Sequence, residues 1–293
     1  MFRSSLAVVV LVLVVPLIAL DGAAARAQSV LDVMTFNIRT AAGRDGEDAW
    51  SLRRDLVVET IRASAPDLIG MQEALDSQIE YLQAALPEYR WLGIDRGLNG
   101  GVGLSEYTPI FYRYSELSPI ESGNFWLTDT PDTPPLRTSG RRRRSGGRIV
   151  TWARFHHRLS GQQIYAFNTH FTLRRGAPQL ASAELVAGRV AALPAGTPVV
   201  VLGDFNNDAE VSDTWRVATG HGLRDVWVEA AETHGPRSTY GDFGPPRPDL
   251  TERVDWILVD GPILVRRAET VVHNDEGRFP SDHYPVTAVL EVQ

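Results

Sequence analysis

The stretch Thr197-Pro-Val-Val-Val-Leu-Gly-Asp-Phe-Asn206 decides the fold of this chain, because an apolar run of strand length ends there in acid and amide side chains. A buried strand that stops at a carboxylate places that carboxylate at the edge of a sheet, where metal ions and substrates have access. Asp204 and Asn206 are therefore candidates for a functional site at a strand end.

The same pattern occurs five more times along the chain. The polar positions are Asn37 in Thr35-Phe-Asn-Ile-Arg39, Gln72-Glu73 after Asp67-Leu-Ile-Gly-Met71, Asn168-Thr-His170 after Gln163-Ile-Tyr-Ala-Phe167, Asp255 in Arg253-Val-Asp-Trp-Ile257, and Ser281-Asp-His-Tyr-Pro285 before Val286-Thr-Ala-Val-Leu290. Six apolar runs flanked by Asp, Glu, Asn or His predict one site at which these side chains converge around a metal ion.

Apolar runs of strand length alternate with longer segments of helical period. The expected strands cover residues 30–36, 67–71, 91–94, 109–112, 149–156, 163–168, 199–202, 254–259 and 286–290, and the expected helices cover 52–63, 77–85 and 179–193. Segments 128–148 and 238–251 are rich in Pro, Gly or Arg and are expected to be loops. This mixture favours an α/β sandwich, in which sheets pack together with helices outside.

Residues 1–27 are typical of a secretory signal peptide, since Arg3 precedes an apolar run and Ala25-Arg-Ala27 is a small-x-small cleavage site. The alternative is an uncleaved membrane anchor, but the apolar run has about 15 residues where a membrane span needs about 20. The chain contains no cysteine, which excludes disulfides and a lipoprotein anchor. We expect one domain, residues 28–293, that is secreted or periplasmic, monomeric and without a stable membrane anchor after cleavage.

The charge of the chain limits its partners. The formal net charge is −7, and removal of the signal segment takes away two Arg and one Asp, which leaves −8. Such acidity argues against broad, sequence-independent nucleic-acid binding, which depends on neutralising phosphates. All 29 basic residues are Arg, so a lysine-based mechanism is excluded.

The candidate residues suit the hydrolysis of a phosphate ester. Glu73 and Asp204 offer hard oxygen ligands, which select Mg²⁺ or Mn²⁺, and the absence of Cys argues against a thiolate zinc site. Such an ion acts as a Lewis acid and template. His170 and His283 can donate to phosphoryl oxygens or protonate a leaving group near neutral pH. Asp255 is the expected partner that fixes the tautomer of His283 and raises its basicity.

The ordered set of motifs resembles the endonuclease/exonuclease/phosphatase superfamily, over nearly the whole chain after residue 27. The residues that carry the resemblance are Asn37, Gln72-Glu73, Tyr112, Asn168-Thr-His170, Gly203-Asp-Phe-Asn206, Arg253-Val-Asp-Trp256 and Ser281-Asp-His283. The resemblance implies a four-layer α/β/β/α sandwich of two mainly antiparallel sheets flanked by helices, with the site at one end.

The resemblance also implies roles for single positions. It implies that Glu73 binds a metal ion together with Asn37 and Asp282. It also implies that Asp204 orients or deprotonates the attacking water and that Asn206 donates to the developing phosphorane. His170 and His283 would hold the scissile phosphate, with Asp255 polarising His283 and Tyr112 near the phosphate. Many relatives have Asp-His after Asn-Thr-His-Phe, whereas this chain has Thr172-Leu-Arg-Arg175. Arg174 and Arg148 are accordingly expected to bind substrate, and Arg141–Arg144 is either a phosphate clamp or a solvated loop.

These observations favour a secreted, Mg²⁺-dependent phosphoesterase, with phosphodiesters slightly preferred over phosphomonoesters. Nucleic acid, a lipid headgroup and a phosphorylated metabolite remain open as substrates. The alternative is a non-catalytic module that binds a phosphate ligand and retains the fold. A zinc hydrolase ranks last, because the sequence has no His-x-x-x-His helix or comparable ligand cluster.

Overall fold

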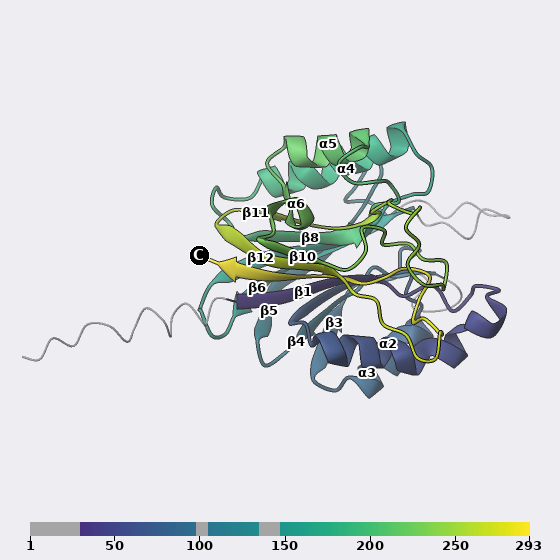
Figure 1. The fold of residues 1–293 in the computed structure, drawn as a ribbon. Coiled ribbons are helices and arrows are strands. Elements are labelled where there is room, and N and C mark those ends of the chain that lie inside the picture. The colour runs from purple at the N-terminus through teal and green to yellow at the C-terminus, as the bar shows by residue number, and fades with distance from the viewer. Residues whose placement is uncertain (1–29, 98–104, 135–146) are drawn as a thin grey trace, which may run out of the picture.

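The computed structural model describes residues 30–97, 105–134 and 147–293 (Figure 1). The expected signal segment and the Arg141–Arg144 run lie outside these residues. Within the described ranges, none of the helices combines the length and apolar character that a membrane crossing requires.

Two β-sheets form the centre of the structure. The seven-stranded sheet has the order β10-β12-β13-β1-β2-β4-β3, with bounds β10 Glu232–His234, β12 Ile263–Thr270, β13 Val286–Val292, β1 Val30–Asn37, β2 Leu68–Gln72, β4 Ile110–Arg113 and β3 Tyr89–Leu92. The six-stranded sheet has the order β5-β6-β7-β8-β11-β9, with bounds β5 Leu117–Trp126, β6 Ile149–His157, β7 Gln163–His170, β8 Val199–Asp204, β11 Asp255–Asp260 and β9 Arg224–Asp225. Most neighbouring strands are antiparallel; β1 with β2, β10 with β12, and β7 with β8 are parallel.

Helices cover the outer face of each sheet (Figure 1). Their bounds are α2 Trp50–Ser64, α3 Asp76–Ala85, α4 Ala177–Ala191 and α5 Asp213–Gly220, with a 3₁₀ turn η1 at Gly46–Asp48. The short α6 Val226–Glu229 instead contacts β11 and β12 and adds Val226 to the core between the sheets. α2 and α3 bury Val57, Ile61 and Leu82 against the seven-stranded sheet, and α4 buries Val186 and Val190 against the six-stranded one. A third core cluster fills the space between the sheets. The expected α/β/β/α sandwich is thus confirmed.

Period-two alternation along the strands explains why the polar ends face one another. In β1, Leu31 and Val33 lie in the core between the sheets, whereas Met34 and Phe36 face the helices. Asn37 follows Val33 and Thr35 in steps of two residues, so its side chain falls on the same face, between the sheets. The same counting places Asp204 after Val200 and Leu202, His170 after Ile164 and Ala166, and Asp255 before Ile257 and Val259.

The three expected helices and nine expected strands are all present, with bounds shifted by a few residues. The sequence analysis did not identify β5, β9, β10, β12, α5 or α6. β5 is a largely exposed edge strand that contains Pro119 and Gly123, so it has no apolar run. β12 carries Arg266-Arg267 at a bulge in its pairing with β13, which interrupts its alternation.

A half-buried acid, Asp67, lies at the end of the sandwich where β2 begins. Asp67 precedes β2, and its carboxylate accepts a hydrogen bond from the backbone N–H of Asp32 at 3.0 Å. Burial raises the pKa of Asp67, and this effect is larger than the lowering by the hydrogen bond from Asp32, so the pKa is about 6. Because the pKa of the folded state lies above the unfolded value, the folded protein binds the proton more tightly, and stability falls as pH rises from about 4 to about 6.

We therefore expect Asp67→Asn to stabilise the protein by about 1–3 kcal/mol at about pH 8 and to have little effect at about pH 4. The amide oxygen of Asn can still accept from Asp32. Urea unfolding at both pH values measures the change, with the exposed Asp249→Asn as control. Equal stability of Asp67→Asn and the parent chain at both pH values would contradict this reading.

Candidate active site

The carboxylate of Asp204 lies at the centre of the converging side chains. Its Oδ2 accepts a hydrogen bond from Nδ2 of Asn37 at 2.9 Å and lies 3.4 Å from Nε2 of His170 and 3.9 Å from Nε2 of His283. Its Oδ1 accepts from the backbone N–H of Asn206 at 2.9 Å. Burial raises the pKa of Asp204, and the nearby charge of Asp255 raises it further. The site thus holds a buried carboxylate that is more basic than an exposed one.

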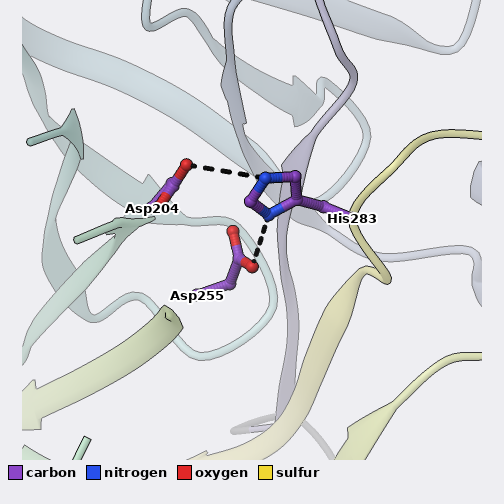
Figure 2. Close-up of side chains that lie close together, drawn as sticks. All are labelled: Asp204, Asp255 and His283. Carbon is purple, nitrogen blue, oxygen red and sulfur yellow. Dashed lines mark hydrogen bonds and ion pairs between the residues drawn. The ribbon is translucent and has the colours of Figure 1, made fainter. Parts of the chain in front are cut away.

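Asp255 and His283 form a buried pair beside Asp204 (Figure 2). Nδ1 of His283 lies 2.8 Å from Oδ2 of Asp255. Burial alone lowers the pKa of His283, but the charge and hydrogen bond of Asp255, with the charges of Asp204 and Asp282, hold it well above the ordinary value. His283 is therefore an imidazolium at neutral pH, with Nε2 directed towards Asp204.

The second histidine, His170, differs from His283 in its charge. His170 is buried at the end of β7, and burial lowers its pKa well below the ordinary value. The charges of Arg148, Arg96 and His283 lower the pKa further. His170 is therefore neutral where His283 is charged, so the two imidazoles are suited to different tasks.

A group of acids suited to metal binding lies on the Glu73 side of the site. Oε1 of Glu73 accepts from Nδ2 of Asn37 at 3.3 Å, and its Oε2 accepts from the backbone N–H of Thr40 at 3.1 Å. Oδ2 of Asp282 lies 3.7 Å from the guanidinium of Arg39. Burial raises the pKa of Asp282, and the charge of Glu73 also raises it, so the two acids are neighbours.

Asn37, expected beside Glu73 in the metal site, lies between Glu73 and Asp204. Its Oδ1 accepts the backbone N–H of Arg39 at 3.0 Å, and its NH₂ group faces Glu73 and Asp204. In this arrangement Asn37 links two carboxylates as a donor.

The structure also brings together Asp204, Asp255 and His283, whose ligand atoms lie within 4.8 Å of one another, as a group that could hold a metal ion. Oδ1 of Asp255 is buried and has no hydrogen-bond partner among the described residues. The unpaired oxygen could accept a ligand, but the charged His283 in this group disfavours a cation there.

Strained backbone positions hold several of these side chains. Glu73 directly follows β2, and Asn206 lies two residues after the end of β8. Their φ angles are 61° and 50°. Non-glycine residues in this left-handed region cost free energy, which the surrounding contacts must offset. Asn206 also donates from its Nδ2 to the carbonyl of Phe171 at 2.9 Å, which leaves one amide hydrogen for a ligand.

Sequence analysis missed two buried residues that position the site. The guanidinium of Arg53 in α2 donates to the carbonyls of Ile38 and Pro280 at 2.7 Å, and to those of Asp48 and Arg39. It thereby joins the loop after Asn37 to the loop before His283. Neither the helical pattern nor any local motif marks Arg53, because its partners are backbone groups distant in sequence.

Gln179, at the start of α4, connects two loops of the site as Arg53 does. Its Nε2 donates to the carbonyls of Thr172 and Asn206, at 2.7 and 3.0 Å, so it connects the loops that follow β7 and β8.

Two of the expected residues lie away from this cluster. Tyr112 was expected near the phosphate, but it pairs with Leu68 at the start of β2, opposite the end that carries Glu73. Its ring lies in the core, 5.1 Å from that of Phe155, and this expectation is wrong because β4 runs antiparallel to β2. Arg174 is exposed in the loop after β7. Arg148, in contrast, lines a pocket with His170.

Comparison with known proteins identifies the family. The model of the endonuclease/exonuclease/phosphatase family matches residues 34–283. The chain belongs to this family. The family's structure from Bacteroides vulgatus is 32% identical with a TM-score of 0.80, and the match covers 90% of this chain and 99% of that one. A mannosyl-6-phosphatase of Bacteroides thetaiotaomicron is 28% identical with a TM-score of 0.78, covering 89% and 99%.

One curated relative, an uncharacterised protein of Acanthamoeba polyphaga mimivirus, is 29% identical over 171 residues. This match covers 54% of the chain and 60% of the relative, so the chain spans about three fifths of the length of the curated relative. Family membership supports hydrolase activity in general, and the fold is the one that the family shares.

Replacing Arg53 should disturb the site through its loops. Arg53→Met leaves several carbonyls without a donor, so we expect a loss of about 2–4 kcal/mol of stability and a fall in kcat larger than any change in KM for a phosphate ester. The adjacent Arg54→Met is the control, because Arg54 is exposed. Thermal unfolding and steady-state kinetics measure both effects. Full activity in a folded Arg53→Met protein would show that the loops hold their places without it.

Proposed function

We propose that this protein is a secreted, Mg²⁺- or Mn²⁺-dependent phosphoesterase that cleaves a P–O ester bond by attack of water. The observation that carries the proposal is the position of Asp204, which faces Asn37, His170 and His283 with one buried oxygen. No structural role in the core calls for a carboxylate shared among these groups, and burying it costs free energy.

Asp204 is the residue that orients and deprotonates the water. Its raised pKa makes it a stronger base than an exposed carboxylate, and its Oδ2 faces the space between the two histidines. The backbone N–H of Asn206 and the amide of Asn37 hold the carboxylate in one orientation. Asn206 has an amide hydrogen left to donate to an oxygen of the phosphorane.

The charged His283 and the neutral His170 divide the remaining work. His283, held by Asp255, presents a proton on Nε2 and a positive charge to the phosphoryl oxygens. His170 stays neutral and offers one N–H donor or one acceptor, so it contributes a hydrogen bond without adding charge.

Glu73 and Asp282 are the residues that would hold the metal. Mg²⁺ prefers oxygen ligands, and ligands must be deprotonated, which disfavours the group that contains the charged His283. When bound, the ion supplies Lewis-acid stabilisation of charge on the phosphoryl oxygens.

The mannosyl-6-phosphatase relative supports a small phosphorylated metabolite as the substrate class. The proposal of export rests on the sequence of residues 1–27, and a monomeric state is a separate part of the proposal. The alternative function, a module that binds a phosphate ligand without hydrolysing it, predicts binding with no turnover.

Removal of the central groups should abolish turnover. We expect Asp204→Asn and His283→Ala each to lower kcat by about 10²–10⁴-fold on p-nitrophenyl phosphate and bis-p-nitrophenyl phosphate. Exposed residues of the same types, in Asp213→Asn and His234→Ala, are matched controls. Circular dichroism checks the fold. Binding of phosphate by the parent protein with no hydrolysis of any ester would favour the binding module instead.

Chelation tests the metal assignment separately. We expect EDTA to stop hydrolysis and Mg²⁺ or Mn²⁺ to restore it, and metal addition to raise the melting temperature because neighbouring carboxylates no longer repel each other. In Glu73→Gln the metal-dependent rise in melting temperature should shrink. Turnover that continues in excess EDTA would exclude a metal-dependent reaction.

A further inference from the structure

A small cationic pocket adjoins the neutral histidine of the site. It is lined by Arg96, Glu106, Tyr107, Thr108, Arg148, Ile149 and His170. The strand start at Ile149 and the strand end at His170 place its walls beside Asp204, whose Oδ2 lies 3.4 Å from His170. The pocket is therefore continuous with the position of the scissile phosphate in the proposed reaction.

Arg148 is a half-buried cation that forms no ion pair with a described residue. Its Nη1 is buried and lacks a hydrogen-bond partner, and no carboxylate of the described chain lies within ion-pair distance of it. Burial lowers the pKa of Arg148 and the charge of Arg96 lowers it further, which shows that the guanidinium is held in an unfavourable place. A protein that retains such a cost has a use for the charge in binding an anion.

Arg96 adds a second positive charge that is only partly compensated. Its Nη1 forms an ion pair with Glu106 at 3.1 Å, while its Nε is buried and unpaired. Two guanidinium groups thus face one carboxylate among the residues that line the pocket, and the charge of Asp204 also reaches Arg148. Guanidinium groups with free N–H donors are well matched to phosphate oxygens.

The size of the pocket limits what can enter it. Its volume is about 10 Å³, close to the room that one water molecule needs. A nucleoside or sugar substituent does not fit, whereas a single phosphoryl oxygen, which is about the size of a water molecule, does. The side of the scissile phosphate that faces Arg148 is therefore free of an ester substituent.

We propose that Arg148 and Arg96 bind the unesterified oxygens of a terminal phosphate, so that the enzyme acts on phosphomonoesters in preference to phosphodiesters. This inference rests on the proposed phosphoesterase function and reverses the slight preference for diesters drawn from the sequence. A monoester dianion carries one more negative charge than a diester, and it presents three free oxygens in place of two. The cationic pocket stabilises that additional charge.

The reaction follows from these contacts. The oxygen of water bonds to phosphorus, the bond from phosphorus to the ester oxygen breaks, and one proton passes to the leaving oxygen. An alcohol and inorganic phosphate are released, and the phosphate retains its contacts with Arg148. Inorganic phosphate should accordingly inhibit by competing with the substrate.

The test compares Arg148→Met with the parent enzyme on two substrates that share a leaving group. At about pH 8, where a monoester carries both charges, the substrates are p-nitrophenyl phosphate and bis-p-nitrophenyl phosphate. We expect kcat/KM to fall about 100-fold for the monoester and about threefold or less for the diester. Arg148→Lys, which keeps the charge, should recover part of the loss. Arg154→Met is the matched control, because Arg154 lies in β6, which directly follows Arg148, and pairs with Glu121 away from the pocket.

A third substrate tests whether Arg148 binds the scissile phosphate or a separate phosphate of the same substrate. Thymidine 5′-(p-nitrophenyl phosphate) with a 3′-phosphate is a diester that carries a separate terminal phosphate. If only this substrate loses activity in Arg148→Met, the pocket binds a remote phosphate and the proposal is overturned. An equal loss on monoester and diester would also overturn it, while leaving phosphoesterase function intact. Inactivity of the parent enzyme on every ester would reject the proposed function itself.

Inhibition by inorganic phosphate gives a second measurement. Its inhibition constant against diester hydrolysis should rise about 10-fold or more in Arg148→Met and should not change in Arg154→Met. Thermal unfolding checks that both variants are folded. An inhibition constant that is the same in all three proteins would contradict phosphate binding by Arg148.

Discussion

The site depends on the buried amide of Asn168, which links the two sheets. The amide of Asn168 in β7 donates to the carbonyls of Met71 and Pro109 at 2.7 and 2.8 Å and accepts from Gln72 at 2.7 Å. Gly70 in β2 leaves room for it, since a Cβ there would lie 2.7 Å from the Asn168 oxygen. The hydrogen bond from Asn37 to Asp204 also crosses between the sheets at this end, and apolar side chains fill the core behind it, so these amides fix the separation of the sheets where acids and imidazoles converge.

Once the sheets are held in this way, burial does most of the electrostatic tuning. The two histidines share a low-dielectric space, yet one has a carboxylate partner and the other has arginine neighbours, so their pKa values move apart. Asp204 lies between them and takes on the raised pKa of a buried acid. The result is three titratable groups in contact that differ in charge state, which is the arrangement expected of acid–base chemistry.

Sequence patterns predicted the layers and the strand ends because both arise from local chemistry. An apolar run that ends in Asp204 or His170 predicts a strand at that place. The alternation of apolar and polar residues along the run predicts which face of the strand is buried. Strand direction is set by long-range pairing, and for this reason Tyr112 was assigned to the wrong end of the sandwich. Arg53 escaped notice because a side chain that serves distant backbone carbonyls leaves no signature in its own segment.

The place of β13 has a consequence for how the chain folds. β13 lies between β12 and β1, so the first strand of the sheet gains its second neighbour only when residues 286–292 are available. Contacts of such large sequence separation close late and slow the search for the native state. During synthesis β1 therefore presents an open edge to solvent for most of the translation time. An enzyme assembled in this order cannot act on its substrate before translation has nearly finished.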